Sequence, residues 1–587
     1  MKLFVFIAFV MLFAACGTKF NPEITVSDIR ENIEYLASDS LKGRKAGEPG
    51  GKLAAEYIRS KFEAAGLELL DENGFQYFNL VASAELGDGN ELTIGDRSYE
   101  AGVDFQPYAF SANTEVEAGL VFAGYGIEVD RDSLKWNDFD GVDVSGKWIM
   151  VLQGDPDLDN PNSPYLEFST ERAKGLTASD RNAAGLILVA GPKFSEQDEL
   201  SSLFFDKNSS RFSIPVLQVT RALANELLEG TGETVASLES KMEEQKKGLN
   251  LTTDATLKVK VDVQLKETTT QNVVAMLPGI DPVLKDEYIV VGGHYDHLGM
   301  GGPGSGSRAV DTVGVHNGAD DNASGISAVI QLAEKLAGEK SNKRSIIFAA
   351  FGAEEMGLVG SKAFTNEPPI DLENVEAMFN FDMVGRLDSL KALSIGGTKT
   401  SIETEEILTD LNTGFKLAFS GEGIGPSDHA SFYLQNIPVF FFSTGAHPDY
   451  HTPQDDADRI NYEGAKAVMD YAEKVVLEVA NRDENLTFQE AGSKFQRSRG
   501  GRFKVTFGIM PDYAGLEERG MRVDGVTKDK PAYRAGMKKG DIITAIEGKP
   551  VKNIYDYMAR LQTLEAGTRV SVDIIRNDKP TVLIVEL

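Results

Sequence analysis

The sequence predicts an α/β fold with a mostly parallel β-sheet flanked by helices, an inserted β-rich unit and a small C-terminal β unit. Two observations support this class. Between residues 255 and 480, short apolar runs alternate with amphipathic stretches, a pattern typical of a parallel sheet covered on both faces. Histidines and acids follow several of the apolar runs, and functional side chains of such sheets gather beyond the carboxyl ends of the strands.

Length and composition narrow the class further. The chain has 587 residues, of which 42% are hydrophobic, and this fits roughly three or four domains with packed cores. It carries 90 Asp and Glu against 59 Lys and Arg, a formal net charge of −31. Such a charge repels phosphate backbones and anionic lipid surfaces, so nucleic acid is not an expected partner.

Residues 1–16 have the features of an export signal. Lys2 precedes an apolar run that is too short to span a bilayer, and two alanines precede Cys16, the only cysteine. This end resembles the lipobox of bacterial lipoproteins, although Phe13 replaces the usual leucine. The resemblance implies that Cys16 is lipidated and anchors the protein facing the periplasm or the cell exterior, the only membrane contact we expect. Ordinary cleavage near Ala15 is the alternative, and in both cases the protein is exported.

Residues 17–112 are expected to form the N-terminal part of the α/β domain. The stretches VSDIRENIEYLAS and GGKLAAEYIRSKFEAAG place apolar residues three and four apart, which predicts two amphipathic helices. From about Val121 the pattern changes to short strands and turns, and we expect a separate β-rich unit over residues 113–254. Its strings FDGVDVSGKWIMVLQGDP and IPVLQVTRALANELL resemble the protease-associated domain inserted in several exopeptidases. It contains no cluster of catalytic residue types, so a lid or spacer is the expected role.

All six histidines lie between His294 and His451, and four of them stand among paired acids. His294 follows the apolar run YIVVGG, while acids follow SIIFAAFGA and end AMFNFD. Because the carboxyl ends of parallel strands meet at one edge of a sheet, we expect these side chains to converge. Imidazole and carboxylate groups suit zinc or a similar divalent ion, and two histidines with three acids fit two ions that share one carboxylate.

A polar stretch over residues 481–503 is the expected linker to a C-terminal unit, residues 504–587. The strings TFGI and KPAYRAGMKKGDIITAIEGKPV resemble a PDZ domain, a small β-sandwich or barrel. The resemblance implies a peptide-binding loop at Phe507, Gly508 and Ile509, whose amides would bind peptide or protein C-termini by strand addition. A packing or dimerisation module with an unused groove is the alternative.

Six ordered strings together resemble the co-catalytic zinc aminopeptidase family, which includes bacterial leucyl aminopeptidases, glutamate carboxypeptidase, glutaminyl cyclase and the non-catalytic transferrin receptor. The strings are GGHYDHLG, NGADDNASG, FGAEEMGLVGS, FNFDMVGR, SDHASF and DYHTP, with LASDSLKGRKAGEPGG upstream. The resemblance implies a zinc-exopeptidase fold over residues 17–112 and 255–480, with two zinc ions or other divalent metals per chain. It also implies five ligands, namely His294 and Asp382 on one ion, Glu355 and His451 on the other, and Asp321 bridging both.

The bridging position depends on the register of this match. The family's bridging acid stands three residues before the serine of a Ser-Gly pair, here Ser324, which selects Asp321 over Asp320. An error in register would move the bridge by one residue. In relatives a cis peptide bond follows this acid, so the resemblance implies a cis bond between Asp321 and Asn322.

Peptide hydrolysis at such a centre also needs a base. The base takes a proton from the attacking water and returns it to the leaving amine, so it should be a carboxylate beside the metals but not bound to them. Glu354 fits this role, and the family assigns it in the same way. Tyr450 resembles a tyrosine that hydrogen-bonds the oxyanion in some relatives, with a plain packing aromatic as the alternative.

Further polar residues are expected around these. Asp296 matches an acid that orients the ligand His294, and Asp428 and His429 are expected to shape the substrate pocket. We expect loop-stabilising roles for the other three histidines, His297, His316 and His447. The string GMGGPG satisfies GxGxxG, but no helix begins within it, as a dinucleotide site requires. We expect this loop to border the substrate cleft instead.

These observations predict an exported zinc-dependent metallo-exopeptidase, an aminopeptidase whose partners are peptide substrates. Two alternatives stay open at this stage. One is a single-zinc cyclotransferase acting on N-terminal glutamine of peptides, and the other is a catalytically silent peptide-binding relative. The number of bound zinc ions distinguishes the first alternative, and the presence of every ligand and the base speaks against the second.

Overall fold

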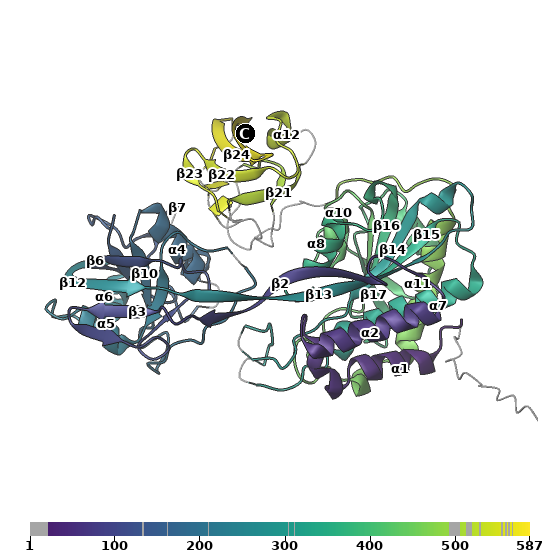
Figure 1. The fold of residues 1–587 in the computed structure, drawn as a ribbon, viewed down its shortest axis with the longest axis horizontal. Helices are drawn as coiled ribbons and strands as arrows, with labels where there is room; N and C mark the ends of the chain where they lie inside the picture. The colour runs from purple at the N-terminus through teal and green to yellow at the C-terminus, as the bar shows by residue number, and fades with distance from the viewer. Residues whose placement is uncertain are drawn as a thin grey trace, which may run out of the picture.

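The computed structural model describes residues 22–491 and 505–587, except for 132–133, 161–162, 209, 303, 310–311, 512–518, 527–529, 553–555, 558–559, 562–563 and 566. The export signal with Cys16 and most of the expected linker, residues 481–503, therefore lie outside the described residues. Three large sheets form three units along the chain (Figure 1). No helix in the described part of the chain is long and apolar enough to cross a membrane.

The α/β unit is built on a sheet of nine described strands in the order β1-β13-β15-β14-β16-β19-β17-β18, with β2 also paired to β13. Its centre is parallel, because β14 runs parallel to β15 and β16, and β16 to β19. β13 and β17 join this centre antiparallel, so the predicted α/β class is confirmed with a mixed sheet. The strands are β1 (Glu68–Leu69), β2 (Phe75–Leu86), β13 (Val263–Leu277), β14 (Tyr288–His294), β15 (Ser345–Phe351), β16 (Val375–Phe381), β17 (Ala392–Gly396), β18 (Lys416–Phe419) and β19 (Val439–Ser443).

Helices cover both faces of this sheet, as fully apolar strands require. In β14, Ile289 and Val291 belong to the core on one face and Val290 to the core on the other. The first face packs against α1 (Val26–Leu36), α2 (Pro49–Ala64), α7 (Gly325–Glu339), α9 (Thr404–Asp410) and α11 (Tyr462–Asn481), and the second against α8 (Val359–Asn366) and α10 (His429–Tyr433). α1 and α2 coincide with the two predicted amphipathic stretches.

The β-rich insert has an eight-stranded sheet and a two-stranded hairpin. The expected limits, residues 113–254, are too narrow, because the sheet begins at β3 and ends with β12. β3 and β4 are short and half exposed, so their sequence lacks the apolar run of a buried strand. The insert contains β3 (Glu91–Ile94), β4 (Arg97–Tyr99), β5 (Phe105–Pro107), β6 (Glu115–Ala123), β7 (Glu128–Arg131), β8 (Leu134–Asn137), β9 (Trp148–Leu152), β10 (Gly185–Val189), β11 (Val216–Val219), β12 (Asn250–Lys260), α3 (Leu166–Ser169), α4 (Glu171–Asp180), α5 (Arg221–Leu227) and α6 (Val235–Gln245).

Two long strands join the insert to the α/β unit. β2 has 12 residues and β13 has 15, and they pair antiparallel along almost their whole length. The resulting ribbon crosses the space between the two units (Figure 1). The insert is therefore connected to the α/β sheet by continuous hydrogen-bonded strands.

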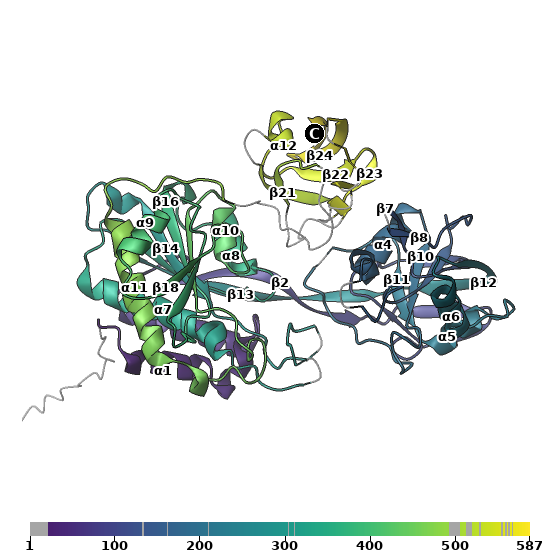
Figure 2. The ribbon, with the colours of Figure 1, turned by 180° about the vertical axis from the view of Figure 1, so that it is seen from behind.

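The C-terminal unit is a small β domain that contacts both other units. It contains β20 (Ile509–Pro511), β21 (Met521–Val526), α12 (Pro531–Arg534), β22 (Ile542–Ile546), β23 (Lys549–Pro550), β24 (Arg569–Arg576) and β25 (Lys579–Glu586). Figure 2 shows it above the β2–β13 ribbon. Arg560 forms a bidentate ion pair with Asp180 of α4 at 2.7 and 2.8 Å, and Lys539 donates to Gln435 of the α/β unit at 3.4 Å.

Candidate metal centre

The predicted ligands and base gather at the carboxyl ends of the central strands. These ends meet at one edge of the sheet, so residues far apart in sequence become neighbours. His294 closes β14, Glu354 and Glu355 follow β15, Asp382 follows β16, His451 lies beyond β19, and Asp321 lies in the turn that precedes α7.

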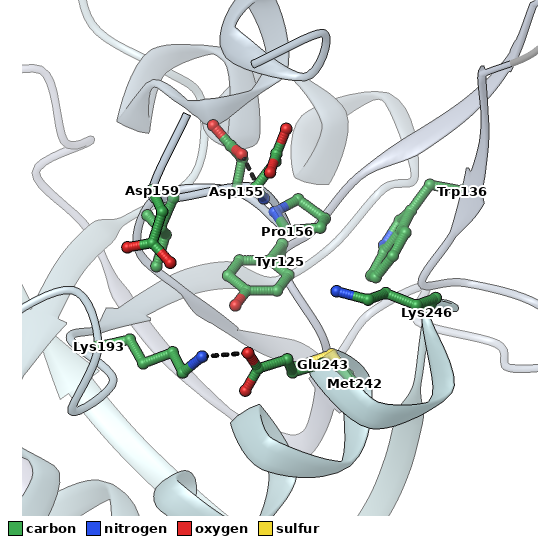
Figure 3. Close-up of a pocket in the computed structure, with 11 residues that line it drawn as sticks. Tyr125, Trp136, Asp155, Pro156, Asp159, Lys193, Met242, Glu243 and Lys246 are labelled. Atoms are coloured by element: carbon green, nitrogen blue, oxygen red, sulfur yellow. Dashed lines mark hydrogen bonds and ion pairs between the residues drawn. The ribbon is translucent and has the colours of Figure 1, made fainter. Parts of the chain in front are cut away.

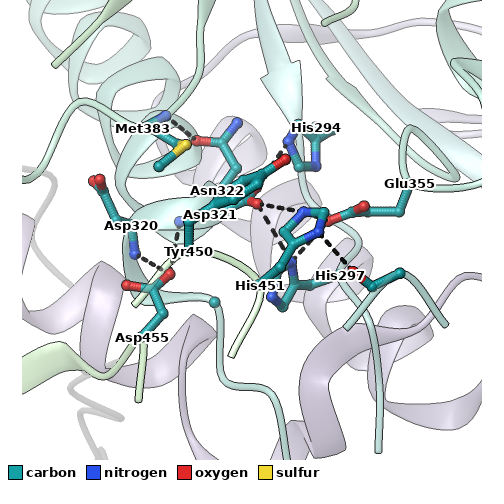
Figure 4. Close-up of polar contacts among 12 residues, drawn as sticks. His294, His297, Asp320, Asp321, Asn322, Glu355, Met383, Tyr450, His451 and Asp455 are labelled. Carbon is teal, nitrogen blue, oxygen red and sulfur yellow. Dashed lines mark hydrogen bonds and ion pairs between the residues drawn. The ribbon is translucent and has the colours of Figure 1, made fainter. Parts of the chain in front are cut away.

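Asp321 lies at the middle of this cluster (Figure 4). Its Oδ1 is 3.3 Å from His294 Nε2, which is also 3.4 Å from Asp382 Oδ1. Its Oδ2 is 3.1 Å from His451 Nε2, which is also 3.3 Å from Glu355 Oε1. The two oxygens of one carboxylate thus face two separate sets of ligand atoms. The peptide bond between Asp321 and Asn322 is cis, as the resemblance implied.

His297 also belongs to the cluster, although we expected it to stabilise a loop. Its Nδ1 is 2.9 Å from Glu355 Oε1 and 3.9 Å from Asp321 Oδ2. The ligand atoms of His297, Asp321 and Glu355 lie within 4.8 Å of one another, as do those of His294, Asp321 and Asp382. The sequence feature that could have indicated this role is the string GGHYDHLG, in which His297 follows His294 by three residues. Spacing in a loop, however, does not show which way a side chain points.

Two other histidines have the loop contacts that the sequence suggested. His316 contacts Ser307 Oγ at 2.8 Å and the Gly314 carbonyl at 3.0 Å. His447 Nε2 is 3.2 Å from Asp320 Oδ2. Asp320 therefore faces away from the ligand groups, and Asp321 occupies the shared position.

Burial and charge act against each other at this cluster. Burial alone would raise the pKa of Asp321, but hydrogen bonds from His294 and His451 hold it well below its ordinary value. Burial likewise opposes the ionised form of Glu355, while His297 and His451 lower its pKa to about 2. Both carboxylates are therefore ionised at neutral pH and can act as ligands.

The donor set fits a pair of zinc ions. Each group supplies one imidazole nitrogen and carboxylate oxygens, the ligand types that zinc prefers in mixed N and O sites. The acids Asp321, Glu355 and Asp382 are buried or nearly so beside one another. Buried like charges at this spacing need a cation to compensate them.

Glu354 lies beside the ligand groups without belonging to either. Its Oε2 is 3.9 Å from His294 Nε2. Burial raises the pKa of Glu354 well above its ordinary value, His294 opposes this, and neighbouring acids add to it. Its backbone N–H donates to Asp296 Oδ1 at 2.9 Å, which fixes the turn that carries both glutamates.

Asp296 contacts His294 in a way that the sequence did not reveal. The His294 Nδ1 lies 3.1 Å from the backbone carbonyl of Asp296 and 3.9 Å from its carboxylate. The ring is therefore oriented by the main chain, and the carboxylate holds the Glu354 turn instead. Burial raises the pKa of Asp296 to about 6.

The remaining site candidates surround the cluster. Asp428 is fully buried, and burial raises its pKa to about 7, opposed by His294. His429 is buried with its ring stacked on Phe441 at 4.3 Å between centroids. The Tyr450 ring stacks on His451 at 3.8 Å, and burial with the nearby acids raises the pKa of its phenol well above the ordinary value, so it stays protonated at neutral pH.

Two residues that hold the centre in place were missed in the sequence. The Asp455 carboxylate accepts the backbone N–H groups of Asp320 and Asp321, both at 3.0 Å, and so orients the shared ligand. It stands four residues after His451 in the string DYHTPQDD, where its acid was visible but its target was not. Arg44 donates to the backbone carbonyls of Tyr295, Asn317 and Gly318.

The predicted peptide-binding loop of the C-terminal unit has its side chains turned inward. Phe507 and Ile509 belong to the core of this unit, with 0% and 1% exposure. Gly508 has a φ of 72°, and a Cβ there would lie 2.1 Å from Lys530 Cβ. Any contact of this loop with a peptide would therefore come from its backbone.

A separate hollow lies in the insert, away from the histidine cluster. Figure 3 shows Tyr125 and Trp136 on its wall, with Lys246 at its edge and Lys193 paired to Glu243. It contains no histidine. Among the described residues, both groups of candidate metal ligands belong to the α/β unit.

This arrangement defines an α/β protein with a candidate dinuclear metal centre. Residues 272–476 match the family model described as Peptidase family M28, and residues 494–587 match that of the PDZ domain. The chain therefore carries a peptidase family M28 domain followed by a PDZ domain.

Individual relatives and solved structures are similar to parts of this chain. Aminopeptidase YwaD of Bacillus subtilis (strain 168) is 31% identical over 185 residues, which cover 30% of this chain and 40% of that protein, less than two thirds of its length. Probable lipoprotein aminopeptidase LpqL of Mycobacterium tuberculosis is 22% identical over 464 residues, 73% of this chain and 79% of that protein. The solved aminopeptidase from Aneurinibacillus sp. strain AM-1 is 22% identical over 79% of this chain and 95% of its own, with a TM-score of 0.47.

Proposed function

We propose that this protein is a zinc-dependent exopeptidase, an aminopeptidase that hydrolyses the N-terminal residues of peptides. The observation that carries the proposal is the position of Asp321, whose two carboxylate oxygens face separate imidazole and carboxylate groups. Relatives that match the M28 segment are named aminopeptidases. Two bound zinc ions would polarise the scissile carbonyl and acidify a water molecule.

In this proposal the chain's own residues bind the metals, move the proton and orient the substrate. His294 and Asp382 would hold one ion, Glu355 and His451 the other, and Asp321 would be shared between them, with His297 beside Glu355 as a further candidate. Glu354 takes a proton from the attacking water and delivers it to the leaving amine, a role that suits a carboxylate of raised pKa. The protonated Tyr450 phenol donates to the developing oxyanion.

Replacing Glu354 with Gln tests this role. The amide keeps the shape of the side chain but cannot accept a proton, so turnover of leucine p-nitroanilide should fall by about 10²–10⁴-fold. Zinc content, measured by atomic absorption, should stay near two per chain. Glu373→Gln, at an exposed glutamate of the same domain, is the matched control and should be unchanged. An unaffected rate in Glu354→Gln would remove Glu354 as the base, and one zinc per chain would favour the cyclotransferase.

We further propose that the protein is exported and anchored through a lipid on Cys16, and that the insert is a protease-associated domain. The relative LpqL is named a probable lipoprotein aminopeptidase, which supports the first of these. Incorporation of a labelled fatty acid into the wild type but not into Cys16→Ser tests it. The position of the insert between two parts of the peptidase domain supports the second.

We also propose that the backbone at Phe507, Gly508 and Ile509 binds peptide C-termini. Comparing the full chain with a variant that lacks residues 494–587, on long and short peptides, measures whether this domain recruits substrate. A larger loss on long peptides than on short ones is the expected result.

A further inference from the structure

The β-rich insert extends one lysine to the metal-ligand cluster. Lys207 lies in the segment between β10 and β11, and its Nζ donates to the backbone carbonyl of Glu355 at 2.6 Å. A methyl group built on Gly306 would lie 3.3 Å from this Nζ and 3.9 Å from His451 Nδ1. The Lys207 ammonium and the His451 imidazole therefore both lie near Gly306, in the loop that borders the cluster.

The insert holds this lysine in a defined position. Arg172 of α4 donates to the Asp206 carboxylate at 2.5 and 2.9 Å, and to the carbonyls of Asn208 and Ser210, both at 3.1 Å. Lys207 itself has a φ of 63°, a left-handed conformation that is uncommon for residues other than glycine. The segment is thus braced on both sides of Lys207.

The same segment contacts the glycine-rich loop beside the cluster. A Cβ on Gly304 would lie 2.9 Å from Phe204 Cδ2. Phe204 and Lys207 therefore form one wall against this loop, and Lys207 also contacts the ligand residue Glu355. This wall comes from the insert, while every candidate ligand comes from the α/β unit.

We propose that Lys207 is a specificity-determining residue that binds a substrate carboxylate on the leaving-group side of the scissile bond. An ammonium has three N–H donors, and the carbonyl of Glu355 takes one of them. The groups around the ligands are mostly acids, which repel a free carboxylate, so a cation on this wall gives an anionic substrate a place to bind. This inference rests on the proposed peptidase function.

The substrate class that follows is the dipeptide with a free C-terminus. Its α-carboxylate lies within about one residue length, roughly 3.8 Å, of the scissile peptide group. Lys207 is held by the backbone carbonyl of Glu355, and the side chain of the same residue is a candidate metal ligand. The ammonium group therefore lies close to where the substrate would be cleaved. Longer peptides and amides carry no charge at this point.

Three substrates with the same N-terminal residue distinguish two roles of Lys207. It could bind the substrate carboxylate, or it could only hold the backbone at Glu355 in place. We would measure kcat and KM of the zinc-loaded full chain on Leu-Gly, Leu-Gly-amide and leucine p-nitroanilide. In Lys207→Gln the KM for Leu-Gly should rise roughly tenfold or more, as expected for loss of one charged hydrogen bond. The values for the two substrates without a carboxylate should stay within about twofold, and Lys207→Arg should recover part of the Leu-Gly affinity.

Lys362→Gln is the matched control. Lys362 donates to the Gly357 carbonyl at 2.9 Å, so it also braces the backbone beside the glutamates but belongs to α8. Its loss should leave the ratio between the three substrates unchanged. An equal loss on all three substrates in Lys207→Gln, or no change on any, would overturn the inference while leaving the proposed function intact. A wild type that hydrolyses none of them would overturn both.

Discussion

Arg44 and Lys174 are two buried cations in different units, and backbone carbonyls accept hydrogen bonds from both. Arg44 lies under the metal-ligand cluster with 1% exposure, and Lys174 lies in the insert with 2%. Each donates to backbone carbonyls, Arg44 to those of Leu36, Tyr295, Asn317 and Gly318 at 2.5 to 3.0 Å, and Lys174 to those of Tyr125, Leu152 and Gly154. Such contacts satisfy the donors of a charge that has left water.

Arg44 and Lys174 differ in which segments of the chain supply the carbonyls that they bind. Arg44 joins the N-terminal layer to the segments that follow His294 and precede Asp321, and several acids of the cluster act on it. Burial lowers its pKa to about 10, so it stays charged at neutral pH. Lys174 joins the turn after β6 to the end of β9, and one of its partners, Tyr125, lines the hollow of Figure 3. Burial lowers its pKa to about 7, opposed mainly by Asp138, while its three carbonyl partners need the three donors of the ammonium form.

Arg44→Met should have the largest effect, because it leaves four carbonyls, three of them in buried hydrogen bonds, without their donor and removes a positive charge beside the acids. We expect the free energy of unfolding to fall by about 3–5 kcal/mol. Bound zinc should also fall below two per chain, since the segments around both ligand groups lose their common anchor. Chemical denaturation and atomic absorption measure the two quantities.

Arg30→Met is the control for that variant. Arg30 is an exposed residue of α1 that pairs with Glu34, and exposed pairs contribute about 0–1 kcal/mol. It should leave zinc binding unchanged. Full zinc occupancy in Arg44→Met would contradict the coupling between this arginine and the ligands.

Lys174→Met should have a smaller and more local effect. Three carbonyls lose their donor, and we expect about 2–3 kcal/mol of destabilisation confined to the insert. Hydrogen exchange should speed up in β9 and β10, while zinc content stays at the wild-type value. Lys193→Met, at a lysine on the surface of the insert that pairs with Glu243, should change neither. A loss of zinc equal to that of Arg44→Met would show that the two cations do not differ as described.

The two cations also show how far the sequence could predict the structure. The strand ends carried the histidines and acids, so the α/β class and the cluster could be predicted from apolar runs and the residues that follow them. Arg44 stood in the quoted string LASDSLKGRKAGEPGG, yet no periodicity marks an arginine that will be buried. Lys174 belongs to a short helix of weak amphipathicity, and its burial depends on carbonyls that lie 20 to 49 residues away in the chain.

Side-chain direction in loops was the other limit. His297 and His451 both approach Glu355, but only His451 was expected as a ligand, because residues in a loop have no fixed period to show which face they share. Lys207 gave no signal at all, since it reaches Glu355 across 148 positions from another unit. Contacts between units depend on how the β2–β13 ribbon positions the insert relative to the α/β unit. A local stretch of sequence does not encode this position.

His429 sharpens the comparison because it is a buried base without such carbonyl partners. Its Nδ1 has no hydrogen-bond partner among the described residues, and burial lowers its pKa to about 3. It is therefore neutral in the fold, whereas the unfolded chain binds a proton below its ordinary pKa of about 6.5. The unfolded state then holds more protons between pH 6.5 and 3, so stability must fall as pH falls through this window.

His429→Phe should remove this dependence at little cost near neutral pH, because a phenyl ring can keep the stack on Phe441. The wild type should lose up to about 1.4 kcal/mol more per pH unit than the variant below pH 6. Denaturation series at pH 4.5, 5.5, 6.5 and 7.5 measure the difference between the two proteins, in which the acids they share cancel. If the stability of the two proteins changed with pH in the same way, the His429 imidazole would take up its proton in the folded state. Carbonyl partners would then not explain why Arg44 and Lys174 are charged while His429 is neutral.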